Sequence, residues 1–239
     1  AEAHASLGYV LYDFDWDWAA AETSLRKAVS LNPSYPEARR WLSHVLLVQG
    51  SPREAFDEIE VGLRLDHNSA NMLQTKAFYQ LADGQLDAAI ATAELAIAAD
   101  PKFHRAYFRK GSSLLRKGDL KNALTVFNQA EAQRPGAYQV AIASVLGAMG
   151  RTQEAREILD QQIARKESQI VSSTHLAEAF YRLGDHAKAL QYFEAAIDEK
   201  DPSIPYFYAG CDWRDLFACL LYTSDAADDT PCVDLGGRR

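Results

Sequence analysis

The stretch AYFRKGSSLLRKGDLKNALTVFNQAEAQRP, residues 106–135, predicts two amphipathic helices joined at Gly118-Asp119. Helical spacing gives the first helix one face formed by Tyr107, Gly111 and Leu114. It gives the second helix one face formed by Leu120, Ala123, Phe127 and Ala130. A helix pair this short cannot bury its apolar face alone, so the stretch predicts copies of itself on either side.

Such copies recur along the chain with a period close to 34 residues. The spacings between successive anchor residues of the second helix are 34, 34, 34, 32 and 34, and these anchors are Ala21, Ala55, Ala89, Ala123, Ala155 and Ala189. Five residues before each of the last five anchors stands a glycine: Gly50, Gly84, Gly118, Gly150 and Gly184. The units end near Pro33, His67, Pro101, Pro135, Ser168 and Pro202, so residues 1–202 are predicted to form six helix pairs.

Each recurring residue has a physical role in this prediction. Glycine ends the first helix because it adopts the left-handed conformation of a helix C-cap without a Cβ clash. Asp119, Asp185 and Ser51 follow such glycines and are expected to cap the second helices by accepting N–H bonds. The anchor alanine lets the two helices approach closely, and the apolar residue four positions later fills the remaining space.

Two units depart from the pattern. The first unit has the turn Asp13-Phe14-Asp15-Trp16-Asp17-Trp18, with no glycine and one extra residue. We expect Asp15 or Asp17 to cap its second helix and Trp16 to pack with Trp18 across the turn. The fifth unit is predicted to begin two residues early, after Pro135-Gly136, with a local change of superhelical pitch.

This pattern resembles the tetratricopeptide repeat, whose motif is W-x2-L-G-x2-Y…A-x3-F…P over about 34 residues. The resemblance covers roughly residues 3–202 and is best in the fourth unit, at Tyr107, Gly111, Leu114, Ala123, Phe127, Ala130 and Pro135. It implies an all-α fold, a right-handed α-α superhelix of about six helix pairs. It also implies a non-catalytic scaffold that binds a partner peptide or helix in the concave groove.

In this family the first helices line the groove. Carried over by position, the residues expected in it are Arg40, Trp41, His44, Asn71, Gln74, Phe78, Arg105, Phe108, Arg109 and Arg116. The last unit also offers His175. Arg105, Arg109 and Arg116 lie near one helical stripe, and guanidinium groups suit capture of a carboxylate or phosphate. These arginines either bind an anionic group of the partner or pair with carboxylates on adjacent helices. Family members that clamp a terminal carboxylate have asparagines where Trp41 and Thr75 stand here, so that clamp is incomplete.

Composition and motifs exclude several other functions. The net charge of −8 argues against a general nucleic-acid binder and against an anionic membrane surface as partner. No catalytic, phosphate-binding or metal-binding motif is present, so we predict no enzyme, cofactor or metal. Carboxylates such as Glu58 and Glu60 are interpreted as solvated, as are most histidines. No compartment is assigned, although the cytoplasm is favoured slightly over the periplasm.

The two ends of the chain carry separate expectations. The chain does not begin with Met and is interpreted as a fragment. Residues 203–218, rich in aromatic side chains, are predicted to cap the last repeat. Residues 219–239 resemble a translated library adapter and are expected to be a non-native, disordered tail, which leaves Cys219 and Cys232 without a role. An alternative function is a sensory or regulatory C-terminal region, because the first unit and the DWRDLF ending resemble repeats of bacterial winged-helix regulators and cyclases.

Overall fold

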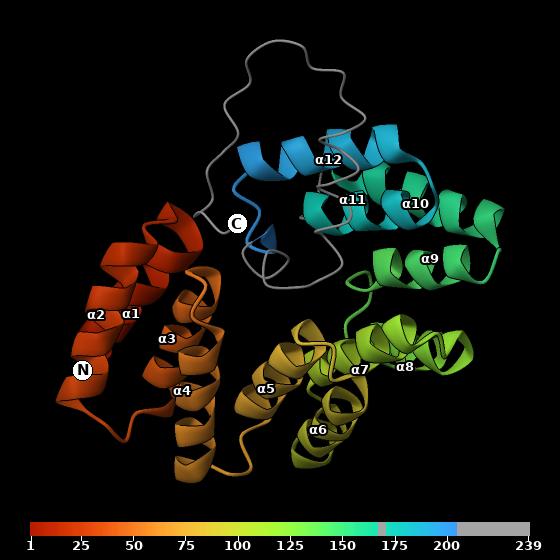
Figure 1. Ribbon diagram of the computed structural model, residues 1–239. Helices are drawn as coiled ribbons and strands as arrows, with labels where there is room; N and C mark the ends of the chain where they lie inside the picture. Colours follow the sequence, from red (N-terminus) through yellow and green to blue (C-terminus); the bar gives the residue numbers. More distant parts are fainter. Residues whose placement is uncertain (167–170, 205–239) are drawn as a thin grey trace.

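The structure is a computed structural model that describes residues 1–166 and 171–204 (Figure 1). Within these ranges it consists of α-helices and one short π-helix, with no strand. The first helices of the six units are α1 (Glu2–Val10), α3 (Pro36–Val48), α5 (Ala70–Ala82), α7 (His104–Lys117), α9 (Gln139–Ala148) and α11 (Ser173–Arg182). The second helices are α2 (Trp18–Leu31), α4 (Pro52–Leu65), α6 (Leu86–Ala99), α8 (Leu120–Gln133), α10 (Thr152–Lys166) and α12 (His186–Asp198).

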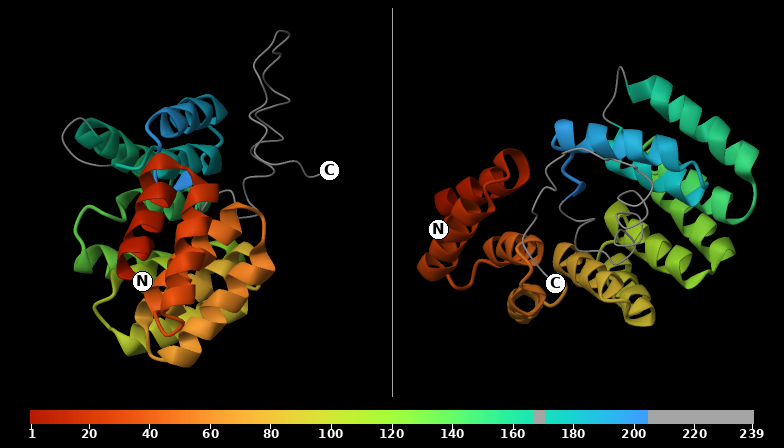
Figure 2. Two further views of the ribbon diagram at one scale, coloured as in Figure 1. Left: turned by 90° about the vertical axis from the view of Figure 1, so that its left-hand side faces the viewer. Right: turned by 45° about the horizontal axis from the view of Figure 1, so that its top comes forward.

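The helix pairs stack side by side into the α-α superhelix that the sequence predicts (Figures 1 and 2). Each first helix packs against its own second helix, and most also pack against the second helix of the unit before. First helices also contact one another along the stack, as α1 does with α3, α5 with α7 and α9 with α11. The first helices therefore line the inner, concave side of the stack.

The recurring small residues take the roles predicted for them. The six anchor alanines are all completely buried. The five turn glycines have φ between 74° and 84°, the left-handed conformation of a helix C-cap. At Gly111 the helices approach so closely that a Cβ atom would lie 2.8 Å from Cε1 of Phe127. The close approach and the residue that fills it, four positions after the anchor, are both confirmed.

The first unit accommodates its extra residue in a π-helix, Leu11–Asp15, because the wider π turn holds one more residue than an α turn. Trp16 then reverses the chain with φ 60°, an uncommon conformation for a residue other than glycine. Asp17 caps α2 by accepting the Ala20 N–H at 3.0 Å, so Asp17 rather than Asp15 is the cap. The rings of Trp16 and Trp18 lie 6.4 Å apart across the turn, as expected.

Other helix starts confirm some expectations and correct others. Asp119 and Asp185 cap α8 and α12 through their side chains. The expected Ser51 cap is wrong, because Ser51 stands at the N-cap of α4 but its side chain makes no capping bond. The early start of the fifth unit is also wrong for its helix, since α9 begins only at Gln139. The preceding loop is held instead by Glu131, whose carboxylate accepts the backbone N–H groups of Gly136 and Tyr138.

Three ion pairs join the second helices α4 and α6 to neighbouring first helices. Arg39 binds Glu58 at 2.6 Å, and Lys76 binds Glu60 at 2.6 Å. Lys110 of α7 likewise binds Glu94 of α6 at 2.8 Å. Glu58 and Glu60 are therefore half-buried partners at helix interfaces, and their interpretation as solvated carboxylates is wrong.

The described chain ends just after the last repeat. Asp201 is buried, and its carboxylate accepts hydrogen bonds from the Ser172 hydroxyl at 2.7 Å, the Thr174 N–H at 3.0 Å and the Ser203 N–H at 2.8 Å. These bonds fix the turn after α12 to the start of α11. Of the capping segment predicted at 203–218, only residues 203 and 204 belong to the described chain, and the tail predicted at 219–239 lies outside it.

Candidate peptide-binding groove

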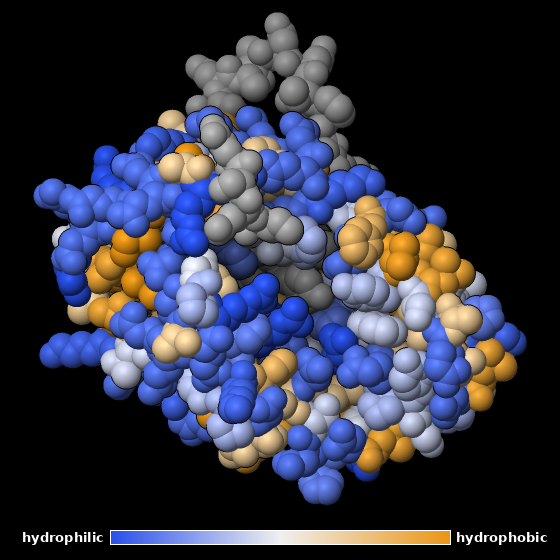
Figure 3. Space-filling view, turned by 180° about the vertical axis from the view of Figure 1, so that it is seen from behind, coloured by the Kyte–Doolittle hydropathy of each residue, from blue (hydrophilic) through white to orange (hydrophobic). Residues whose placement is uncertain are grey.

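The ten predicted groove residues all lie on the consecutive inner helices α3, α5 and α7. In the space-filling view the surface is hollowed near its centre, and hydrophilic side chains border the hollow (Figure 3). The ten residues differ in how far their side chains are exposed. His44, Gln74 and Phe78 are between 4% and 6% exposed, whereas Arg105 is exposed and the other six are partly buried. The buried residues can act only by positioning the exposed ones.

Arg109 is held between α5 and α7 by groups on both helices. Its Nε donates to the side-chain oxygen of Gln74 at 3.2 Å. Its guanidinium carbon lies 4.5 Å from the ring centre of Phe78 and 5.4 Å from that of Phe108. A cation between two aromatic rings is attracted to their faces and loses much of its freedom. Arg109 is therefore a fixed positive charge in the wall of the groove.

Arg105 lies one helical turn before Arg109 and is the exposed member of the pair. Among the residues that the structure describes, Arg105 forms no ion pair or hydrogen bond. Burial is the largest influence on the pKa of His104 on its own helix and of Asp13 in the first unit, and the charge of Arg105 lowers both pKa values. Burial has the larger effect on the Asp13 carboxyl and raises its pKa overall. Arg105 is thus an exposed, positively charged side chain on the first helix α7.

Arg116 does not act together with Arg105 and Arg109. Its Nη1 donates to the backbone carbonyl of Leu81 near the end of α5. This carbonyl also accepts the Gly84 N–H at 3.1 Å, and a carbonyl in the last turn of a helix is a favourable acceptor for a cation. The structure therefore gives Arg116 a role at the end of α5, apart from Arg105 and Arg109.

The α3 side of the groove is aromatic and internally paired. The Arg40 side chain binds the Glu37 carboxylate through two nitrogens, at 2.9 and 2.7 Å. Trp41 stacks on Tyr9 of α1, with ring centres 5.1 Å apart. The Tyr9 hydroxyl in turn donates to Asp13 at 3.1 Å. This wall offers apolar ring surface, since its cation is already neutralised within α3.

His44 is a buried group, although its position in the repeat predicted a groove-lining side chain. It is 4% exposed, and its ring nitrogens lie 3.2 Å from Arg40 Nη1 and 3.3 Å from the Tyr79 hydroxyl. Tyr79 also bonds the Ser43 hydroxyl at 2.8 Å. Burial, followed by the positive charges of Arg40 and Arg109, holds the pKa of His44 well below its ordinary value of 6.5. His44 is therefore neutral at pH 7 and links α3 to α5.

Asn71 contributes least of the ten. It is partly exposed, and its backbone carbonyl accepts the Thr75 hydroxyl at 2.9 Å within α5. Thr75 itself is fully buried, so it cannot contact a partner in the way that the family's asparagine does at this position. The incomplete carboxylate clamp expected from the sequence therefore also lacks an exposed polar group here.

Phe108 sits in an aromatic cluster on the other side of the groove. Its ring centre lies 5.8 Å from Phe127, 5.4 Å from Tyr138 and 5.9 Å from His175. The Tyr138 hydroxyl forms a short hydrogen bond with Nδ1 of His104. Burial raises the pKa of Tyr138 and lowers that of His175. Tyr138 was missed in the sequence because it precedes the shortened helix α9, where the repeat pattern is weakest.

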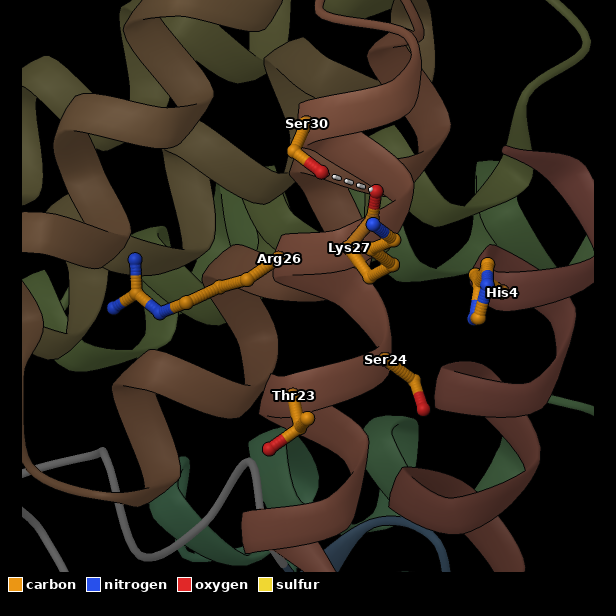
Figure 4. Close-up of a pocket in the computed structure, with 6 residues that line it drawn as sticks. All are labelled: His4, Thr23, Ser24, Arg26, Lys27 and Ser30. Carbon is orange, nitrogen blue, oxygen red and sulfur yellow. Dashed lines mark hydrogen bonds between the residues drawn. The ribbon is translucent and has the colours of Figure 1, made fainter.

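A second hollow lies between α1 and α2 (Figure 4). The residues that line it are His4, Thr23, Ser24, Arg26, Lys27 and Ser30. Arg26 points away from His4 and binds Glu22 at 2.7 Å and Glu54 at 3.0 Å, and Ser30 donates to the Lys27 carbonyl (Figure 4). The hydroxyls of Thr23 and Ser30 bond within α2 and the guanidinium of Arg26 is neutralised, so this hollow resembles a surface between helices more than a ligand site.

Residues 1–166 and 171–204 contain no group of three metal-ligating side chains placed to hold an ion. In the same ranges no helix combines the length and the apolar character needed to cross a membrane.

Comparison with known proteins agrees with this architecture. The sequence model of the Tetratricopeptide repeat family matches residues 17–70, 76–138 and 140–204. The chain belongs to the tetratricopeptide repeat family. Proteins of this family generally mediate protein–protein interactions, and they are generally not enzymes.

Curated relatives are distant and much longer than this chain. Superkiller protein 3 of Schizosaccharomyces pombe is 26% identical over 219 residues, which cover 85% of this chain and 15% of that protein. Superkiller complex protein 3 of Homo sapiens is 26% identical over 148 residues, which cover 61% of this chain and 9% of that protein. The comparisons show the repeat family, and the winged-helix or cyclase parent stays a prediction.

Solved structures share the fold. A thermophilic tetratricopeptide protein of Thermus thermophilus has a TM-score of 0.65 at 19% identity, over 82% of this chain and 98% of that one. PilF of Pseudomonas aeruginosa has a TM-score of 0.61 at 18% identity, over 87% of this chain and 95% of that one.

Proposed function

We propose that this chain is a non-catalytic interaction scaffold that binds a partner peptide or helix in its concave groove, with an acidic group of the partner on Arg105. The observation that carries the proposal is the exposed guanidinium of Arg105, which forms no ion pair with any residue in the described ranges. Charged groups at a protein surface are usually solvated, so the neighbouring aromatic surface is needed to make this one selective.

That aromatic surface lies on both sides of the two arginines. Phe108 on α7 and the stacked Trp41 and Tyr9 on α3 and α1 are partly exposed. Arg109 supplies a second positive charge, fixed by Gln74 and by the rings of Phe78 and Phe108. A short peptide with an aromatic residue near a carboxylate fits this arrangement, because rings stack on its apolar walls and the carboxylate accepts guanidinium N–H bonds.

The test uses the full chain and synthetic peptides. A fluorescent peptide with two aspartates beside one tryptophan is compared with its asparagine counterpart by fluorescence anisotropy. We expect the acidic peptide to bind at least ~10-fold more tightly, and we expect Arg105→Glu to remove that preference. Lys121→Glu is the matched control, since Lys121 is an exposed cation on the second helix α8.

Arg105→Glu is preferred over a change at Arg109 because Arg105 is exposed, whereas Arg109 is bonded to Gln74 and packed between two rings. Far-UV circular dichroism of the variant should match that of the unchanged chain. Equal affinity of Arg105→Glu and Lys121→Glu for the acidic peptide would refute the assignment of Arg105. Equal affinity of the unchanged chain for both peptides would refute an anionic partner.

A further inference from the structure

An apolar stripe lies exposed on the first helix. Leu7, Val10 and Phe14 follow one another at helical spacing and are 50%, 43% and 58% exposed. Ala3, one turn earlier on the same side, is exposed too. The other large apolar side chains exposed in the described ranges occur singly, on α2, α4, α6 and α12. Scattered apolar residues are ordinary on a protein surface, whereas a continuous stripe marks an interaction face.

The same stripe is buried one unit later. Ala38, Leu42 and Val45 of α3 precede their anchor Ala55 by 17, 13 and 10 residues. Ala3, Leu7 and Val10 precede Ala21 by 18, 14 and 11 residues, and the difference of one is the extra residue of the π-helix. On α3 these three side chains are at most 1% exposed. The first helix therefore carries, uncovered, a face that its equivalent helix buries.

The structure also shows what covers the equivalent face of α3, α5 and α7. Leu42 and Val45 share a buried cluster with Leu25 of α2. Ala38 shares another with Ala28 of α2. At the position of Leu7, α5 and α7 carry Lys76 and Lys110, whose ion pairs reach Glu60 on α4 and Glu94 on α6. The covering element is thus the second helix of the preceding unit.

End units of helical repeat arrays need a polar outer face, because nothing stacks on them. The face of α1 is apolar along its whole length, and hydrophobic side chains gather at the end of the molecule that the first helix pair forms, on the right in Figure 3. We propose that this face docks the second helix of one more tetratricopeptide helix pair, placed directly before α1 in the same polypeptide.

The chemistry of the docking helix follows from the face. Leu7 stands where Lys76 and Lys110 pair with glutamates, so a carboxylate on the docking helix would have no lysine partner there. The helix α2, which covers the equivalent Leu42, carries Arg26 at the position of those glutamates. The docking helix also needs a small residue opposite Ala3, as Ala28 is opposite Ala38. The curated relatives have room for such a pair, since this chain spans 15% and 9% of their length.

The experiment adds such a pair to the full chain. A copy of residues 1–35 is fused directly before Ala1, so that the copied α2 meets α1 in the register in which α2 meets α3. We expect one cooperative unfolding transition, a melting temperature raised by at least ~4 °C and a steeper urea dependence, because more apolar surface is buried. Leu7→Lys with Val10→Lys in the inner α1 should remove this gain.

The matched control is the same double substitution in the chain without the fusion. It should leave the melting temperature unchanged, because both side chains are exposed there. A fused chain that melts in two steps, with the original transition in place, would overturn the proposal. So would sedimentation of the unfused chain as a dimer that the double substitution dissociates, because the face would then belong to a second copy.

Discussion

Gly111→Ala should destabilise the protein, although alanine normally stabilises a helix interior. A Cβ at this position would lie 2.8 Å from Cε1 and 2.9 Å from Cδ1 and Cζ of Phe127. That ring cannot retreat, because it is 1% exposed and packs against Phe108. Replacing glycine in a helix gains about 1 kcal/mol, and overpacking a core costs about 1–3 kcal/mol. The net loss should reach up to about 2 kcal/mol.

Two comparisons test whether the Phe127 ring causes the loss of stability in Gly111→Ala. In a Phe127→Leu background the same Gly111→Ala change should become neutral or stabilising, since the smaller side chain leaves room for a methyl group. Gly62→Ala is the matched control in the intact chain. Its Cβ would meet Cε of Met72, the end of a flexible thioether that can turn aside. We therefore expect Gly62→Ala to be neutral or stabilising.

The assay is urea unfolding followed by far-UV circular dichroism, with the midpoint and slope of each variant compared. A coupling energy of about 1–3 kcal/mol between positions 111 and 127 is the expected outcome of the double-mutant cycle. If Gly111→Ala stabilises the chain equally with phenylalanine and with leucine at position 127, the contact does not restrain the helices. The account of the repeat's close approach would then be refuted.

Further predictions concern buried polar groups. Because burial lowers the pKa of His44, the unfolded chain takes up a proton that the folded chain does not, so stability should fall as pH drops below 6.5. His44→Gln should flatten this fall in pH-dependent urea unfolding, whereas His186→Gln, at an exposed position, should not. Asp201→Asn should lower the free energy of unfolding by about 1.5–3 kcal/mol at pH 7, because the buried carboxylate accepts three hydrogen bonds. Burial raises the pKa of Asp201, but its hydrogen bonds lower the pKa by more, so the folded carboxyl has a pKa below 3.8. The loss of stability caused by Asp201→Asn should therefore shrink as pH falls through and below 3.8. Lys110→Met should lower the free energy of unfolding by at most about 1 kcal/mol, because the ion pair of Lys110 with Glu94 is partly solvated. Thermal unfolding measures this loss.

The fold was predictable because it depends on backbone constraints that recur in the sequence. Each turn glycine occupies a conformation that other residues enter at a cost, and each anchor alanine stands where a larger side chain would separate the helices. These constraints leave the same residue type at the same spacing in successive units. Even the departure in the first unit was visible as an extra residue, although its form, a π-helix ending at a left-handed Trp16, was not.

The site was less predictable because the repeat pattern gives the direction of a side chain and not its partner. Position in the repeat placed His44 and Gln74 toward the groove, yet Tyr79 and Arg109 on neighbouring helices cover and bond them. The partners lie 35 residues away in both cases, one unit along the chain. No local sequence signal distinguishes an arginine that stacks on two rings, such as Arg109, from an exposed one, such as Arg105.

The side chains of the groove and those of the exposed apolar face of α1 differ in the contacts that they make. Arg109 and His44 use their hydrogen bonds to hold α3, α5 and α7 together, so the groove keeps its shape without a ligand. Arg105 makes no such contribution within the described chain, which leaves its charge for a partner. The exposed Leu7 and Val10 of α1 differ in kind, because the equivalent Leu42 and Val45 of α3 are buried by unit stacking. A peptide ligand is therefore the proposed occupant of the groove, and another helix pair is the proposed occupant of the apolar face of α1.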